Sequence, residues 1–349
     1  MNKDDARRSL ARLAGHASRE LLTKQPHWGD AILCDGLLAA AEALNDDAPA
    51  KAVERWFAPK LAAGPALAGW FWFWAAEALP ALNLHLRTGR GEYLDYARAI
   101  VDAFETRATR TRDGAIVPHP PALEVWVDVS HFTAPAMALL GRLTADAPLI
   151  ERALDQLIVH WRNLADPATD LLWHVAYAEK NTHSPCLWAR GNSWFSIAAP
   201  MVISIVESEG YHDRYREKTD LVQRALVRQL CAVIALQDPS GLWHTVIDRP
   251  DSYLETSAAA GFADALGMAV TARYAGLDIE RARAAHESAL AAIAAKINDA
   301  GEFTGVSQQT PPGDFAFYNS IEVGAAPFGT GLCLSALSHA LAPDRGGHQ

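Results

Sequence analysis

The chain has 349 residues, 50% of them hydrophobic and 21% charged, which suffices for a large buried core in a globular protein. Its formal net charge of −10 argues against a nucleic acid partner, because proteins bind the phosphate backbone with clustered Lys and Arg. No apolar run reaches the roughly 18 residues of a membrane helix, so no membrane partner is expected either.

The N-terminus and the cysteines predict a cytoplasmic protein. Residues 1–15 contain no apolar core of a secretory signal. Cys34, Cys186, Cys231 and Cys333 lie far apart and lack CxxC spacing, so we interpret them as reduced thiols. Zinc-protease, nucleotide-binding and serine-hydrolase motifs are also missing, and we expect neither a metal ion nor a cofactor.

About twelve segments follow the helical pattern, with apolar residues at i, i+3, i+4 and i+7. The first begins near SLARLAGHASRELL (residues 9–22), and the last is GLCLSALSHALA (residues 331–342). Between them, RALDQLIVHW (152–161) and LVQRALVRQLCAVIAL (221–236) follow the pattern clearly. Gly, Pro and Asp mark the breaks, as they do at helix ends. The sequence therefore predicts an all-α protein.

A short motif recurs in the breaks between these segments. DPATDLLWHV (residues 166–175) resembles DPSGLWHTV (238–246), and DGAIVPH (113–119) and AGEFTGV (300–306) are looser versions. The spacing fits one helical hairpin plus a loop, and about six such units fill the chain. Six hairpins in a ring form an (α/α)6 barrel with equivalent loops or short strands at one rim. We predict this fold, as a single domain over residues 1–349.

Three histidines lie in or beside the recurring loops. If the loops share a rim, His119, His174 and His244 approach one cleft. A lone histidine is more often structural than catalytic, and His119 within PHPP fits a rigid turn. His174 is the preferred candidate for a catalytic role, and His119 is a candidate for binding a ligand.

LEVWVDVSHF (residues 123–132) places one acid among apolar residues. Valines and Trp126 surround Asp128, and His131 follows one turn later. In one interpretation Asp128 is simply a helix N-cap. In the other, the apolar surroundings disfavour the carboxylate and keep a proton on the group, as a general acid requires. Trp126 and His131 are then candidate substrate contacts.

CLWARGNSW (residues 186–194) combines two indoles with a guanidinium. Trp188, Arg190 and Trp194 could pack the start of a helix. A buried Arg among tryptophans nevertheless needs an anion or an aromatic face. The set suits a sugar acid, whose C–H face stacks on indole and whose carboxylate binds Arg.

The order of these motifs resembles the unsaturated glucuronyl and rhamnogalacturonyl hydrolases, glycoside hydrolase families 88 and 105. The resemblance runs from about Leu86 to Leu337 and rests on five segments in order. These are WVDVSHFTAPAMALLG (126–141), LLWHV (171–175), LWARGNSW (187–194), GLWHTVIDRPDSYLETSAAAGFADAL (241–266) and GTGLCLSAL (329–337).

The resemblance implies an (α/α)6 barrel and a distinctive reaction. Polysaccharide lyases leave a C4=C5 double bond in the terminal uronate. In this family an aspartic acid protonates C4 of the vinyl ether and helps water add at C5, and the hemiketal collapses to release a sugar and a 4-deoxy keto-uronate. By this resemblance, Asp128 and His174 match the catalytic residues of the family. Trp188, Arg190 and Trp194 match its substrate-binding residues, and His119 corresponds less closely to a family histidine that precedes the catalytic aspartate.

The chain departs from the family pattern at three places. Where the family has a second aspartate, this chain reads GWFWFWAAEAL (residues 69–79), and Glu77 is the nearest acid. Ser193 replaces a glycine after the RGN triplet, and Val129 follows Asp128 where Gly or Asp is common.

Two other classes of function are open at this stage. One is another sugar enzyme on the same fold, such as an inverting glycosidase or an epimerase. A conventional glycosidase would need a second carboxylate facing Asp128, and Glu77 or Glu124 would be its best source. A non-catalytic glycan-binding barrel would keep the aromatic residues without turnover. The sequence carries no signal for an oligomeric state.

Overall fold

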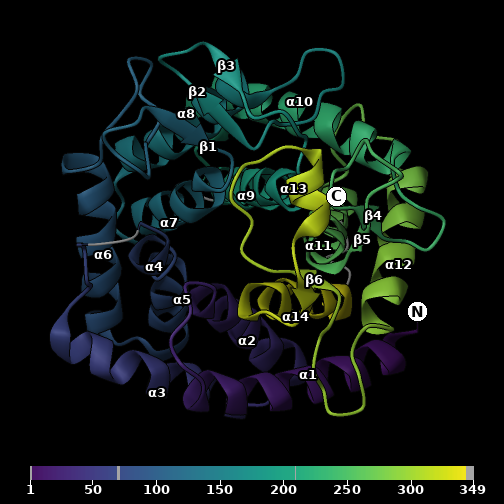
Figure 1. The fold of residues 1–349 in the computed structure, drawn as a ribbon. Coiled ribbons are helices and arrows are strands. Elements are labelled where there is room, and N and C mark those ends of the chain that lie inside the picture. Colours follow the sequence, from purple (N-terminus) through teal and green to yellow (C-terminus); the bar gives the residue numbers. More distant parts are fainter. Residues whose placement is uncertain (1, 69–70, 209, 343–349) are drawn as a thin grey trace.

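The computed structural model describes residues 2–68, 71–208 and 210–342. Within these ranges, twelve longer helices form an inner ring enclosed by an outer ring (Figure 1). The outer helices are α1 (Lys3–Thr23), α3 (Ala48–Ala63), α6 (Gly91–Thr106), α8 (Ala147–Leu164), α10 (His212–Ala235) and α12 (Ile279–Ala294). The inner helices are α2 (Asp30–Leu44), α5 (Ala78–Thr88), α7 (Val129–Leu143), α9 (Ala189–Ser208), α11 (Thr256–Ala272) and α14 (Pro327–Leu341). The predicted (α/α)6 barrel is confirmed.

Burial explains why each helix lies in its layer. Outer helix α8 has one apolar face, on which Ile150, Leu154 and Leu157 are fully buried, and Asp146 caps its first turn. Inner helix α7 is buried around most of its circumference, as a helix enclosed by others must be. No helix among the described residues combines the length and the apolarity that a membrane span requires.

The recurring sequence motif forms one recurring turn. A turn with the same hydrogen bond follows each of α6, α8, α10 and α12. In each turn, a backbone N–H donates to the carbonyl of the residue four or five positions later in the chain. The equivalent turns cover residues 111–115, 166–171, 238–242 and 298–302. The internal repetition in the sequence is therefore structural, and it brings loops far apart in the chain to the same rim.

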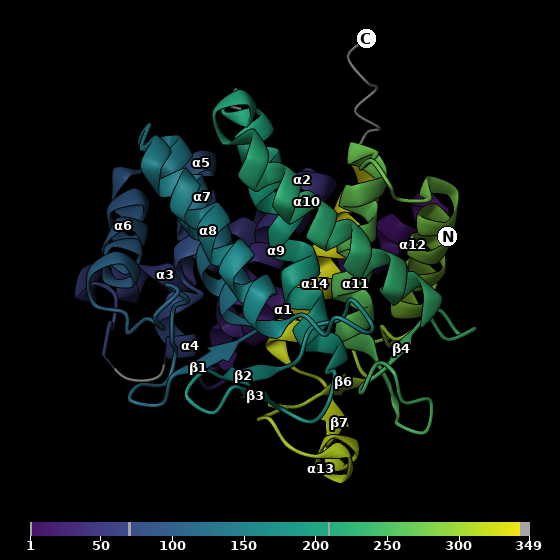
Figure 2. The same ribbon diagram turned by 90° about the horizontal axis from the view of Figure 1, so that it is seen from above.

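Short strands and two short helices cover one face of the ring (Figure 2). Three strands pair antiparallel in the order β1 (Glu124–Trp126), β2 (Val175–Tyr177), β3 (Thr182–His183). The others form the pairs β4 (Trp243–His244) with β5 (Leu254–Glu255), and β6 (Val306–Ser307) with β7 (Val323–Gly324). The short helices are α4 (Phe71–Ala75) and α13 (Phe315–Ser320).

The first and last inner helices close the ring. Helices α2 and α14 pack so closely that a Cβ atom added at Gly36 would collide with the backbone of Gly331. A Cβ at Gly331 would in turn collide with the carbonyl of Ile32. Only glycine allows this approach, so the closure depends on small residues in both helices.

An ion pair joins inner helices α14 and α11 near the C-terminal end of α14. The Nδ1 atom of His339 contacts Oδ1 of Asp264, whose charge raises the pKa of the imidazole against the smaller opposing effect of desolvation. With a folded-state pKa above the unfolded-state value of about 6.5, the pair stabilises the fold fully below that value. Its contribution is lost as the pH rises through the folded-state pKa.

We therefore expect the stability difference between the wild type and His339→Gln to be larger at about pH 5.5 than at about pH 8.5. The His339 side chain is 49% exposed, so solvent screening keeps the effect small. Urea unfolding at the two pH values measures it. A difference that stays constant or grows with pH would contradict the prediction.

Candidate active site

A pocket of about 500 Å³ opens on the face of the ring that carries the strands. Five aromatic side chains make up much of its wall: Trp28, Trp72, Trp126, Phe132 and Trp188. The remaining lining residues are His119, Glu124, Asp128, His174, Arg190, Gln309, Thr310, Pro311 and Pro312. They come from segments that are far apart in the chain, from Trp28 to Pro312, because rim segments of several hairpins converge there.

Asp128 and His174 face each other in the pocket. Strand pairing sets them side by side: Trp126 of β1 pairs with Val175 of β2, and the Val127 N–H donates to the His174 carbonyl at 3.0 Å. Oδ2 of Asp128 lies 3.6 Å from Nε2 of His174, slightly beyond hydrogen-bonding distance.

Neither of these two atoms has a hydrogen-bond partner among the described residues, although both are buried. Asp128 precedes α7 but its side chain caps no N–H, so the helix-cap interpretation is wrong. The chain of Val125, Val127 and Val129 around it is fully buried. Two facing buried groups that each leave a polar atom without a hydrogen bond are costly to fold, and such pairs occur mostly where a ligand or a reaction uses them.

Two indoles pack against the His174 ring. Its centroid lies 5.2 Å from that of Trp126, edge to face, and 4.3 Å from that of Trp188. Its Nδ1 atom lies 2.6 Å from the Tyr318 hydroxyl. The imidazole is 1% exposed, so both its position and its orientation are fixed.

His119 belongs to an aromatic cluster that also lines the pocket. The indole N–H of Trp72 donates to Nε2 of His119 at 3.2 Å, and the His119 ring lies 5.0 Å from that of Trp126. Burial lowers the pKa of His119, so the ring is neutral near pH 7. The indole N–H of Trp126 donates to Oε2 of Glu124 at 2.9 Å.

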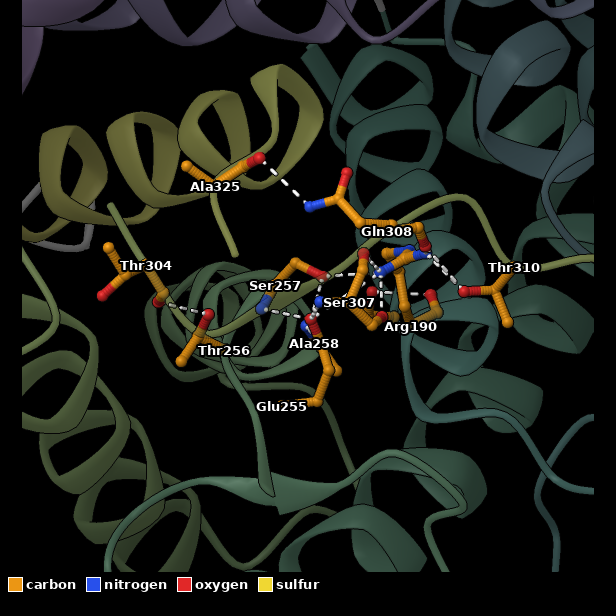
Figure 3. Close-up of polar contacts among 11 residues, drawn as sticks. Arg190, Glu255, Thr256, Ser257, Ala258, Thr304, Ser307, Gln308, Thr310 and Ala325 are labelled. Atoms are coloured by element: carbon orange, nitrogen blue, oxygen red, sulfur yellow. Dashed lines mark hydrogen bonds and ion pairs between the residues drawn. The ribbon is translucent and has the colours of Figure 1, made fainter. Parts of the chain in front are cut away.

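Arg190 is buried, and its two Nη atoms make hydrogen bonds inside the protein (Figure 3). Its Nε atom has no hydrogen-bond partner among the described residues. The guanidinium lies 4.5 Å from the ring of Trp188 and 4.5 Å from that of Phe328. Nη1 donates to Ser257 and Ser307, and Nη2 donates to Gln308 and Thr310.

The partner anion of Arg190 is Glu255, which is also fully buried. Oε1 of Glu255 lies 3.7 Å from Nη1, and the same carboxylate caps α11 by accepting from Ser257 and Ala258. The anion and the aromatic faces expected for Arg190 are therefore both present, but the protein itself supplies them. The geometry thus places Arg190 as the support of residues 307–310, not as a free fork for a substrate carboxylate.

Two of the expected substrate contacts lie behind the pocket wall. Trp194 is fully buried and His131 nearly so, and their rings stack 5.0 Å apart. Burial lowers the pKa of His131 to about 4. One helical turn beyond Asp128, the side chain at position 131 points toward α9 and not toward the rim. His244 is also outside the pocket, where its Nδ1 contacts the Ser252 carbonyl.

Glu77 does not replace the missing second aspartate of the family pattern. It accepts hydrogen bonds from Lys60 at 2.6 Å and from the Tyr96 hydroxyl, and it lines a separate pocket between α3 and α6. Glu124 is thus the one carboxylate, besides Asp128, among the described residues that line the rim pocket.

Several lining residues had no signal in the sequence analysis. Phe132 belongs to an apolar stretch that looks like core, Trp28 stands alone in the polar stretch KQPHWGD (24–30), and Trp72 is one of several aromatics in a row. The segment QQTPP (residues 308–312) could have been found, because paired prolines after polar residues mark an irregular loop.

Among the residues that the structure describes, no group of three or more His, Cys, Asp or Glu side chains could hold a metal ion.

Comparisons with known proteins agree with this geometry. A solved structure described as a possible member of the GH105 family from Klebsiella pneumoniae superposes with a TM-score of 0.86 at 25% identity, covering 98% of this chain and 94% of that one. An unsaturated glucuronyl hydrolase from Bacillus sp. GL1 shares the fold with a TM-score of 0.73 at 17% identity, over 95% and 96% of the two chains.

Sequence comparison gives the family. The unsaturated rhamnogalacturonyl hydrolase YesR of Bacillus subtilis is 33% identical over 192 residues, which cover 53% of this chain and 54% of YesR. The match thus spans about half the length of that relative. The sequence profile of glycosyl hydrolase family 88 matches residues 4–342, nearly the whole chain. The chain therefore belongs to glycosyl hydrolase family 88.

Proposed function

We propose that this chain hydrolyses oligosaccharides that end in a C4=C5 unsaturated uronate, with Asp128 as the general acid and base. The observation that carries the proposal is the facing pair of Asp128 and His174 in an aromatic pocket, where the buried Oδ2 and Nε2 atoms that face each other have no hydrogen-bond partner among the described residues. Membership of glycosyl hydrolase family 88 supports it, as does the likeness to YesR, which is an unsaturated rhamnogalacturonyl hydrolase.

The proposed reaction begins with proton transfer from the Asp128 carboxyl group to C4. The π electrons of the C4=C5 bond form the new C4–H bond, and the ring oxygen stabilises the cation left at C5. Water then attacks C5 and gives a proton to the Asp128 carboxylate, which restores the acid. The resulting hemiketal opens and releases the leaving sugar and a 4-deoxy keto-uronate.

The pocket residues have distinct proposed roles. Trp126 and Trp188 stack on the sugar, since indole faces bind the C–H face of pyranose rings. His119, which also lines the pocket, contacts the substrate. Arg190 acts through the rim segment that it holds, and the stacked pair of His131 and Trp194 supports the wall from behind.

The proposal extends to the organisation and the location of the protein. Residues 1–349 are proposed to act as one catalytic barrel, because both the family match and the ring of helices span nearly all of them. A cytoplasmic location is supported by the four free cysteines. Cell fractionation tests the location.

A panel of lyase-generated unsaturated disaccharides tests the activity. The C4=C5 bond is conjugated with the uronate carboxylate, so hydration removes its ultraviolet absorbance. We expect this absorbance to disappear with at least one member of the panel. If every disaccharide binds without losing absorbance, the chain is a glycan-binding barrel and not a hydrolase.

The charges of the pocket predict a neutral leaving sugar. Asp128 and Glu124 are acidic, and Arg190, the one Lys or Arg among the described lining residues, has its four Nη hydrogens in use. A sulfate or a second carboxylate near Glu124 would meet a like charge. We expect kcat/KM to be about tenfold higher for a disaccharide with a neutral leaving sugar than for its sulfated counterpart.

The Glu124→Gln variant tests this preference for a neutral leaving sugar. It also distinguishes the proposed hydration mechanism from that of a conventional two-carboxylate glycosidase. In the variant, the ratio of kcat/KM between the neutral and the sulfated substrate should fall, because the negative charge of Glu124 is gone. The kcat for the neutral substrate should stay close to that of the wild type. A conventional two-carboxylate glycosidase would instead lose on the order of 10²-fold or more in kcat with the same change.

A further inference from the structure

The hydroxyl group of Tyr318 is buried beside the candidate site but takes no part in the reaction steps proposed above. Tyr318 lies in the short helix α13, more than a hundred residues along the chain from His174, and is completely buried. Its ring packs with Trp188, Cys186 and Val246 in a small cluster separate from the main core. Its oxygen lies 2.6 Å from Nδ1 of His174.

We propose that Tyr318 is a positioning residue, which fixes His174 as the tautomer with its proton on Nε2 and thereby aims an N–H donor at Asp128. The catalytic consequence rests on the proposed function, whereas the tautomer is a property of the resting protein. The two parts can therefore fail independently.

The direction of the hydrogen bond follows from the surroundings of the phenol. Burial raises the pKa of Tyr318 far above its usual range, so the hydroxyl keeps its proton at any pH of interest. A buried hydroxyl proton needs an acceptor. Among the described residues, Nδ1 of His174 is the one acceptor within hydrogen-bonding distance.

The tautomer of His174 follows from that direction. An imidazole nitrogen that accepts a hydrogen bond carries no proton, so a neutral His174 must carry its proton on Nε2. Nε2 is the atom 3.6 Å from Oδ2 of Asp128. The indoles of Trp126 and Trp188 pack against the ring and oppose a flip that would exchange its two nitrogens.

This arrangement has a specific effect on the proposed reaction. After Asp128 gives its proton to C4, its carboxylate has no hydrogen-bond donor within the described protein other than Nε2–H of His174, which needs to move by only a few tenths of an ångström. A donor at that place stabilises the carboxylate that forms. The opposite tautomer would present a lone pair there and would repel it.

The resting protein allows a direct test by ¹⁵N NMR. In histidine-labelled full-length protein, the ¹⁵N shifts of protonated and unprotonated ring nitrogens are well separated, and His174→Gln assigns the His174 signals. We expect an unprotonated Nδ1 and a protonated Nε2 in the wild type. We expect the signals of Tyr318→Phe to move toward a mixture of tautomers. A wild type with its proton on Nδ1 overturns the proposal, and so does an unchanged tautomer in Tyr318→Phe.

Kinetics with an unsaturated disaccharide test the catalytic part. Tyr318→Phe should lower kcat on the order of 10-fold to 100-fold with little change in KM, as the loss of a partner that orients a site residue typically does. Tyr215→Phe is the matched control, because the Tyr215 hydroxyl is also buried and donates to the Ala147 carbonyl at 2.8 Å, far from the pocket.

The control separates an orienting effect from simple loss of stability. Both variants keep the aromatic ring and lose one buried hydrogen bond, so similar falls in melting temperature are expected. A kcat that falls equally in both, or a Tyr318→Phe that loses only substrate affinity, overturns the catalytic part. If the wild type turns over no uronyl disaccharide, the proposed function fails, and the NMR result still decides the tautomer.

Discussion

Asp128→Asn is expected to lower kcat on the order of 10²-fold to 10⁴-fold, because an amide cannot donate a proton to C4. The same change should leave the melting temperature unchanged or slightly raised. The Asp128 side chain caps no helix and its buried Oδ2 atom has no partner, so no protein hydrogen bond is lost. Replacing a buried acid with a neutral amide of the same shape also removes a desolvation cost.

The loss of ultraviolet absorbance of an unsaturated disaccharide measures the activity, and thermal unfolding measures the stability. Asp166→Asn is a suitable control, because Asp166 lies in a rim turn outside the pocket and an Asn can keep its bonds to the turn. If Asp128→Asn keeps kcat within a few-fold of the wild type, Asp128 is not the acid.

Arg190→Met is expected to lower the free energy of unfolding by about 3 kcal/mol, near the lower end of what breaking a buried ion pair costs. The guanidinium and its partner Glu255 are 1% and 0% exposed, so the change leaves a carboxylate in the core without its counterion. Backbone N–H groups of Ser257, Ala258 and Ser307 still bond to that carboxylate, which limits the loss. Chemical denaturation measures the change.

A double-mutant cycle with Glu255→Gln isolates the ion pair from the other contacts of Arg190. We expect the double variant to be more stable than the sum of the single changes predicts, by at least about 1 kcal/mol. Additive losses would mean that the serine and carbonyl acceptors, and not the ion pair, account for the effect of Arg190. In either case, the rim segment from Ser307 to Thr310 loses its support.

The fold could be predicted because its two main signals are local. Apolar periodicity identified the helices, and the resemblance between DPATDLLWHV and DPSGLWHTV exposed the repeat that makes a ring of hairpins. The backbone bonds of residues 166–171 and 238–242 show that the same sequence signal builds the same turn. The two shortest helices, α4 and α13, have no period long enough to detect.

The candidate site could be predicted only in part, because a sequence does not say which way a side chain points. Asp128 and His174 were found from residue type and from the family resemblance, and the pairing of β1 with β2 brings them together. His131 and Trp194 have equally suggestive types, yet both face the core. Whether a site residue already uses its hydrogen-bonding atoms within the protein, as Arg190 uses both Nη atoms, depends on residues more than a hundred positions away.

The contact between Gly36 and Gly331 also constrains how the molecule is made. The two glycines are about 300 residues apart, which a ribosome adding roughly 5–20 residues per second covers in about 15–60 s. During that interval α14 has not yet been synthesised. The apolar surface of α2 that later packs against α14 therefore stays uncovered. Nascent chains of this protein should therefore be a substrate for chaperones until α14 emerges, and a ribosome stalled before that helix should hold an open, protease-sensitive ring.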